Sequence, residues 1–408
     1  MENQTSTVPV EDSIPDASKI PKPRPFLLME GGLLFRIEGR VGLVRRNAPL
    51  TIRRAFFAAC LTWLPLLVFT LLRGTALGGV HIPFLRDFSA YTRFLLGIPL
   101  LLLTELIVAP RIADAAEQFL LTGIVQPKDY KRFDAAIENG LRLRDSVLAE
   151  AIIFALAYTV TFFTYRAVTV HAATWYSTAM PDGTFSLTGA GWWQFLICVP
   201  LFQFLILRWV WRIFLWFRFL GTVSKLDLRL FPTHPDSAGG LGFVGEAQRF
   251  FGLLLFSYSC AITGVIANEV VYGGLKLEAF APAAAVWVLF AILLAALPLM
   301  VFTPKLLVLK RRGLHQYGAL ATAYTGSFHH RWIEGHNPEH EHLLGTGDIQ
   351  SLADLSGSYE IIEHMKPIPI DPKALLQLVV LALLPMFSLL LTVMPLKQVL
   401  QLMMKVVV

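Results

Sequence analysis

Three ionisable residues lie in apolar stretches of the chain, where a charge could act on an ion or a small ligand. Glu105 interrupts a run that is otherwise free of charged residues, and Arg208 and Arg212 are four residues apart at the end of another. A charge inside hydrocarbon costs several kcal/mol and often marks an ion or substrate path. Glu105, Arg208 and Arg212 are therefore a candidate ion or ligand site. The alternative is a structural ion pair between Glu105 and an arginine of the fourth span.

A second candidate site is the Gly- and Pro-rich segment LDLRLFPTHPDSAGGLGF, residues 226–243. His234 and Asp236 could bind an ion or titrate there, while Gly239, Gly240 and Gly242 permit a sharp turn or a close approach of the backbone. In the alternative interpretation, Asp236 only caps its own turn. The GLGFVG match to a dinucleotide motif has no preceding strand, and the His-Pro-Asp tripeptide has no basic helix before it. We give neither pattern weight.

A histidine-rich stretch is the third candidate. It has enough imidazole and carboxylate groups for a divalent metal ion, from His329, His330, His336, His340 and His342 with three glutamates between them. Pro338 separates His336 from His340, so a helical ligand pair is not expected. The alternative is a solvated polar loop. The sequence identifies no cofactor and no known catalytic spacing, so a non-enzymatic role is favoured.

These residues must be positioned by membrane-spanning helices. Hydrophobic residues make up 55% of the chain and charged residues only 16%, and the mean hydropathy is +0.58. Apolar runs long enough to cross roughly 30 Å of hydrocarbon as helices occur at 55–72, 94–110, 151–170, 190–207, 250–268, 279–304 and 374–396. The sequence therefore predicts an all-α, polytopic transmembrane helix bundle of about seven spans.

The basic residues predict the orientation of the bundle. Of the 35 Lys and Arg residues, nine lie in residues 1–54, six in 111–146, six in 208–249 and seven in 305–373. The remaining seven are assigned to the opposite side of the membrane. Because basic loops stay in the cytoplasm, the amino terminus is expected inside and the carboxyl terminus outside. We expect a helix within residues 126–146 that continues into the third span. Residues 221–249 are expected to form a loop, and another helix is expected to begin near Ile349.

The domain organisation follows from this partition. Residues 1–54 form a cytoplasmic tail and a basic interfacial segment, and residues 55–304 form six spans with cytoplasmic loops at 111–146 and 208–249. Residues 305–373 form a cytoplasmic segment, and residues 374–408 form the seventh span and an amphipathic carboxyl-terminal helix that could line an oligomer axis. Arginines interleaved with apolar residues before the first span suit anionic lipid headgroups. The expected partners are thus the bilayer, anionic headgroups at the basic inner face and further copies of this chain, with no nucleic acid.

Three segments resemble an uncharacterised group of bacterial multi-spanning membrane proteins. They are HPDSAGGLGF, GDIQSLADL and LLPMFSLLLTVMPL, and the resemblance runs from about the fourth span to the end of the chain. It implies a location in the bacterial inner membrane and brings no known activity. In that membrane, the carboxyl terminus that the basic residues place outside is periplasmic.

Three functions are consistent with these patterns. The first is an oligomeric transporter or channel for an ion or small solute, with its path near Glu105 and the fourth-span arginines. The second is a membrane scaffold or sensor that docks a cytoplasmic partner through residues 221–249 and 305–373. The third is an enzyme that processes a lipid or isoprenoid and uses His234 and Asp236 with a metal ion.

Overall fold

The chain folds into an all-α bundle with seven helices long and apolar enough to cross a membrane, as the sequence predicts. The computed structural model describes residues 25–29, 31–32, 48–168, 174–180, 185–335 and 346–392. Within these ranges the seven spans are Thr51–Leu72, Phe88–Leu121, Val147–Tyr165, Gly189–Val223, Gly242–Val271, Leu277–Ala296 and Pro372–Leu390. The protein is therefore an integral membrane protein that crosses the bilayer several times.

The longer helices, in chain order, are α2 (Ala48–Leu72), α4 (Ile98–Leu121), α5 (Tyr130–Arg144), α6 (Val147–Val168), α8 (Val199–Val223), α10 (Gly252–Val271), α11 (Ala281–Ala296), α12 (Thr303–Phe328), α13 (Asp348–Glu363) and α14 (Pro372–Leu383). Short helices are α3 (Phe88–Ala90), α7 (Gly189–Trp193) and α9 (Gly242–Arg249), with 3-10 turns at Phe84–Arg86, Pro127–Asp129, Leu277–Phe280, Met300–Phe302 and Leu384–Thr392. One antiparallel pair of strands, β1 (Ser177–Ala179) and β2 (Phe185–Leu187), aligns Ser177 with Leu187.

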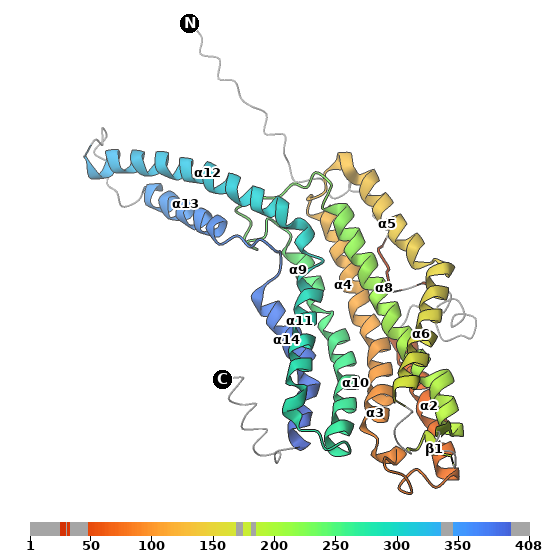
Figure 1. Cartoon of the computed structure of the whole chain (residues 1–408). Helices are drawn as coiled ribbons and strands as arrows, with labels where there is room; N and C mark the ends of the chain where they lie inside the picture. Colours follow the sequence, from red (N-terminus) through yellow and green to blue (C-terminus); the bar gives the residue numbers. More distant parts are fainter. Residues whose placement is uncertain are drawn as a thin grey trace.

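Two groups of spans stand side by side in Figure 1. Helices α2, α4, α6 and α8 lie in one group, and α10, α11 and α14 in the other, with α10 packed against the π-helical start of the second span. Helices α12 and α13 pack on each other and project from one end of the bundle as an arm, and β1 lies at the opposite end. We call these the arm end and the hairpin end.

Two of the spans contain a π-helix. Residues Tyr91–Gly97 (η3) lead into α4, and Gln194–Cys198 (η5) lead into α8. A π-helical turn rotates the side chains that follow it relative to a regular α-helix, and such turns are frequent at functional sites. Both π-helices lie on the two spans that carry Glu105, Arg208 and Arg212.

The hairpin end is held together by one buried carboxylate. Asp87 accepts hydrogen bonds from Trp175 Nε1 at 2.8 Å, from Asn268 Nδ2 at 2.7 Å and from the backbone N–H of Ser89 at 2.8 Å. The indole of Trp175 and the carboxylate are both buried. These bonds connect the start of the second span, the segment before β1 and the end of α10.

The two groups of spans approach each other closely at Gly264 of α10. A methyl group on Gly264 would collide with Thr92 Oγ1 and would lie 2.8 Å from the carbonyl oxygen of Phe88. Small residues allow membrane helices to approach in this way.

We expect Gly264→Ala to lower the free energy of unfolding by about 1 to 3 kcal/mol, because the added methyl group overfills a packed contact. The matched control is Gly326→Ala in α12, where nothing lies within 4 Å of the added atom. That change should raise helix stability by about 1 kcal/mol. Melting temperatures in detergent check both results. If both variants change the melting temperature by the same amount in the same direction, Gly264 is not at a close contact between helices.

The structure departs from the sequence predictions between the spans. Helix α5 ends at Arg144 and α6 begins at Val147, so the expected helix does not continue straight into the third span. Helix α8 continues to Val223, and α9 starts at Gly242, so the loop expected at 221–249 is shorter at both ends. Helix α13 begins at Asp348, beside the predicted Ile349. The arm helix α12 was not predicted, and the carboxyl-terminal amphipathic helix lies outside the described residues.

Candidate functional site

Glu105 lies at the centre of a buried group of charges, which we call the Glu105 cluster. Its carboxylate is 2.6 Å from Arg212 Nη1, 3.8 Å from Arg208 Nη1 and 3.7 Å from Arg54 Nη1. All four residues are buried, with at most 7% of each exposed. Three guanidinium groups thus lie around one carboxylate inside the bundle.

Three spans position these side chains. Glu105 is on α4, Arg208 and Arg212 are one turn apart on α8, and Arg54 is in the first turns of α2. Trp209 Nε1 donates a hydrogen bond of 3.1 Å to the carbonyl oxygen of Leu101, which fixes α8 against α4. Glu105 is six residues before Arg111, so the cluster lies about 9 Å along the helix from the predicted membrane boundary at the arm end.

Residues 25–29 and 31–32 pack against the cluster. The carbonyl oxygen of Met29 accepts a hydrogen bond of 2.7 Å from Arg212 Nη2, and that of Gly31 accepts one of 3.2 Å from Arg208 Nη2. Phe26, Leu28 and Met29 are buried. The ring of Phe26 lies 4.5 Å from that of Phe219, centroid to centroid. We call the described residues 25–29 and 31–32 the docked segment.

The turn between α5 and α6 holds the other end of the docked segment. Arg144 Nη1 donates to the carbonyl oxygen of Leu27, and the N–H of Gly32 donates to Asp145 Oδ1 at 3.0 Å. A side chain at Gly31 would collide with Arg144, and one at Gly32 with the buried Glu150. These two glycines, with φ of +150° and +96°, let the backbone approach charged groups closely.

The arginines of the cluster differ in how fully they are bonded. Arg212 donates short hydrogen bonds to Glu105 and to Met29. Arg208 Nη1 is buried and has no hydrogen-bond partner in the part of the chain that the structure describes. A buried donor without an acceptor is costly. Arg208 Nη1 therefore has capacity for a further acceptor, such as an oxygen atom of a small oxyanion or a halide ion.

The structure brings together the three residues predicted for the first site and adds two components that the sequence did not single out. Arg54 is one of many arginines before the first span, and no spacing distinguishes it. The docked segment contributes backbone carbonyl groups, for which there is no residue-type signal. The predicted alternative of an ion pair with fourth-span arginines is confirmed in its geometry.

The loop at 226–243 is organised around Asp236. Its carboxylate accepts hydrogen bonds from the N–H groups of Ala238 at 2.8 Å, Gly240 at 3.1 Å and Gly242 at 2.8 Å. Gly239 and Gly240 have φ of +68° and +97°, a region that favours glycine. Asp236 thus caps its own backbone, as in the second interpretation of this segment.

His234 lies beside Asp236, with its Nδ1 2.8 Å from Asp236 Oδ1 and its side chain 43% exposed. The loop also joins the arm to the bundle, because the N–H of Lys366 donates a hydrogen bond of 2.7 Å to the carbonyl oxygen of Ser237. An ion-binding role for His234 and Asp236 stays a prediction.

We expect Asp236→Ala to destabilise the folded loop at residues 226–243 by about 2 to 3 kcal/mol, because three backbone N–H groups lose their acceptor. Limited proteolysis should then cut within residues 224–241, where the unchanged protein resists. The control is Asp227→Ala, whose carboxylate is 63% exposed and pairs with Lys128 at the surface. If the two variants are cleaved at the same rate, Asp236 does not organise the loop.

The histidine-rich candidate is only partly covered by the structure. His329 and His330 lie in the π-helical turn His329–Ile333 that follows α12, and His329 Nε2 is 3.9 Å from Glu334 Oε1. His336, His340 and His342 lie outside the described residues. Among the described residues, no group of three or more His, Cys, Asp or Glu side chains could hold a metal ion. Metal binding by the complete stretch stays a prediction.

The three cysteines are free: Cys198 and Cys260 are buried and Cys60 is partly exposed.

Comparison with known proteins identifies no family in which this arrangement of residues can be examined. The chain matches no protein-family model, no curated protein and no solved structure.

Proposed function

We propose that this membrane protein carries a small anion across the bilayer, and that the Glu105 cluster is its anion-binding site. The observation that supports this most strongly is the buried group of three arginines around one carboxylate. A guanidinium presents several N–H donors to an anion. Arg208 Nη2 and Arg212 Nη2 donate to neutral carbonyl groups of the docked segment, and Arg208 Nη1 has no hydrogen-bond partner among the described residues. An anion would replace those carbonyls with a charged acceptor and a stronger hydrogen bond.

The interior favours a carrier over an open channel. Ile98, Leu101 and Leu102 are buried on the second span between the cluster and the hairpin end. On the other side, the docked segment covers the arginines. A conformation closed on both sides must rearrange to move a solute. The π-helices η3 and η5 lie on the two spans that supply most of the cluster, and such turns are frequent at functional sites.

Cell location and assembly are part of the same proposal. The arm end faces the cytoplasm of a bacterial cell, the bundle spans the inner membrane, and several copies assemble. The distribution of Lys and Arg and the resemblance of the three segments support this orientation and location. Reporter fusions on both termini test it, with signals expected in opposite compartments.

The test of the proposed activity is anion efflux from vesicles that contain the purified full chain. Chloride, nitrate, phosphate and sulfate are loaded in turn, and rubidium efflux serves as the cation control. We expect at least one anion to leave faster than from empty vesicles, and rubidium not to. Arg208→Met should lower this efflux by at least tenfold, because a fully buried charge contact is worth more than 1.4 kcal/mol.

The matched control is Arg218→Met, an exposed arginine on the same helix. Arg208→Lys keeps the charge and should retain part of the efflux. Melting temperatures distinguish lost transport from lost folding. If no anion leaves faster than from empty vesicles, or if Arg208→Met moves it as fast as the unchanged chain, the proposed function is wrong.

A second function, docking of a cytoplasmic partner, is favoured by the arm. Helices α12 and α13 project away from the bundle (Figure 1), and Leu320 and Ile349 on them are exposed. Removing residues 314–363 should leave anion efflux intact and abolish partner capture, if the arm serves docking alone. We do not propose lipid-processing catalysis, because the carboxylate of Asp236 already accepts three hydrogen bonds from backbone N–H groups of its own loop.

A further inference from the structure

The span α11 stands apart from most of the bundle. It packs against α14, and α14 in turn packs against α10. The structure leaves a hollow of about 580 Å³ bounded by α8, α10 and α11. Its lining is apolar and includes Trp209, Tyr258, Ala283, Ala284 and Trp287. Val210 and Val286 on its rim are 55% and 67% exposed, so the hollow opens sideways toward the hydrocarbon of the bilayer.

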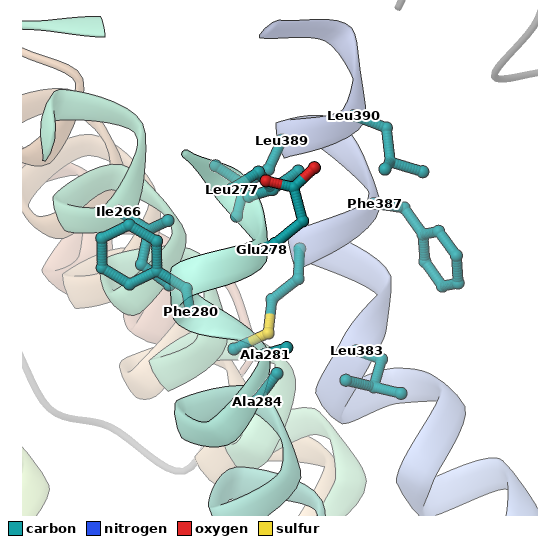
Figure 2. A pocket seen from close by; sticks show the side chains of 11 residues that line it. Ile266, Leu277, Glu278, Phe280, Ala281, Ala284, Leu383, Phe387, Leu389 and Leu390 are labelled. Atoms are coloured by element: carbon teal, nitrogen blue, oxygen red, sulfur yellow. The ribbon is translucent and has the colours of Figure 1, made fainter. Parts of the chain in front are cut away.

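A second hollow of about 450 Å³ adjoins the first toward the hairpin end. The two share Ile266, Ala284 and Met386 in their linings. Figure 2 shows this second hollow, where the carboxylate of Glu278 lies among otherwise apolar side chains. That carboxylate would repel a negatively charged group at the hairpin end of the combined groove.

The arm end of the groove carries the opposite charge. Leu254 lines the larger hollow, and Phe250 is one helical turn, about 6 Å, further toward the arm end. Two guanidinium groups lie over the ring of Phe250, that of Arg111 at 5.0 Å and that of Arg249 at 5.1 Å from its centroid. Arg249 is 3.0 Å from Glu246, whereas Arg111 is exposed and forms no ion pair among the described residues.

We propose that this groove binds an anionic phospholipid of the leaflet at the arm end. One acyl chain would lie in the apolar hollow between α8, α10 and α11, and the phosphate-bearing headgroup would meet Arg111 and Arg249. The charges at the two ends of the groove select this orientation, since the arginines attract the headgroup and Glu278 opposes the reverse placement. A guanidinium binds a phosphate oxygen well. This lipid site adjoins the Glu105 cluster at Trp209, whose ring lies 5.8 Å from the Arg212 guanidinium. The proposal does not depend on anion transport.

Native mass spectrometry of the full chain in mild detergent tests the proposal. Phosphatidylglycerol and phosphatidylcholine with the same acyl chains are added in competition. We expect the unchanged chain to prefer phosphatidylglycerol by at least tenfold, since each interfacial arginine favours an anionic lipid several-fold. Arg111→Gln combined with Arg249→Gln should remove the preference. Arg142→Gln, whose side chain is 74% exposed on α5, is the control and should keep it.

A second pair of variants tests the hollow itself. Ala283→Leu combined with Ala284→Leu fills it and should lower retention of either lipid by at least tenfold. Ala285→Leu, at an exposed position of α11 outside the lining, should not. Equal binding of the two lipids by the unchanged chain, or unaltered retention after filling, would overturn the proposal. So would a second copy of the chain cross-linked into the groove in place of lipid.

Discussion

Glu105→Ala is expected to destabilise the folded protein more than any other single change in the spans. Without the carboxylate, the guanidinium groups of Arg54, Arg208 and Arg212 would face one another in a buried site. Removing one partner of a buried ion pair typically costs about 3 to 5 kcal/mol, because the remaining charge has no counter-ion. The expected result is a large drop in melting temperature, or loss of the monodisperse species, in the same detergent.

The matched control is Glu117→Ala, an exposed glutamate of the same helix. This change should have little effect, since exposed ion pairs contribute at most about 1 kcal/mol. Combining Glu105→Gln with Arg212→Met should restore part of the lost stability, because it removes one positive charge together with the negative one. If Glu105→Ala melts at the temperature of Glu117→Ala, the cluster does not carry the charge interactions described above.

Phe26→Ala is expected to raise anion efflux by about tenfold or more. The ring of Phe26 is buried against Phe219 and holds the docked segment over the arginines. Truncating a buried phenylalanine costs about 3 to 5 kcal/mol, and each 1.4 kcal/mol changes an equilibrium tenfold. The segment should therefore leave its site more often and uncover Arg208 and Arg212. Efflux from vesicles with a fixed amount of protein measures the change.

Phe56→Ala is the control for this prediction. Phe56 is on α2 and is 71% exposed, so its truncation removes a similar side chain without touching the docked segment. Its efflux should equal that of the unchanged chain. Lower efflux in Phe26→Ala, with the melting temperature preserved, would mean that the segment forms part of the transport path and does not close it.

Hydropathy predicted the spans well because a helix in hydrocarbon must satisfy its own backbone and present apolar side chains over its whole length. The same reasoning singled out Glu105, Arg208 and Arg212, since a charge in such a helix stands out against its neighbours. An N-cap at Asp371 was also predictable, because aspartate is common at the N-cap and Pro372 suits the first helical position. The carboxylate of Asp371 accepts a hydrogen bond of 2.8 Å from the N–H of Lys373. That bond holds the pKa of Asp371 below its ordinary value.

Other features leave little trace in the sequence. The docked segment binds arginines through carbonyl groups, which every residue has. Arg54 looks like an ordinary basic residue at a membrane boundary. The π-helices Tyr91–Gly97 and Gln194–Cys198 have no residue in common that marks them as π-helical. The break at Asp145 and Ser146 contains neither glycine nor proline; Ser146 Oγ accepts a hydrogen bond from the N–H of Ala149, and Asp145 Oδ1 accepts one from the N–H of Gly32. Tertiary contacts position the docked segment and Arg54.

The most direct test of the central claim is anion efflux in the double variant Phe26→Ala with Arg208→Met. If the docked segment covers an arginine-based anion site, Phe26→Ala raises efflux only while Arg208 is present, and the double variant falls to the level of Arg208→Met alone. If the double variant keeps the raised efflux of Phe26→Ala, the anion passes by another route and the Glu105 cluster is not its binding site.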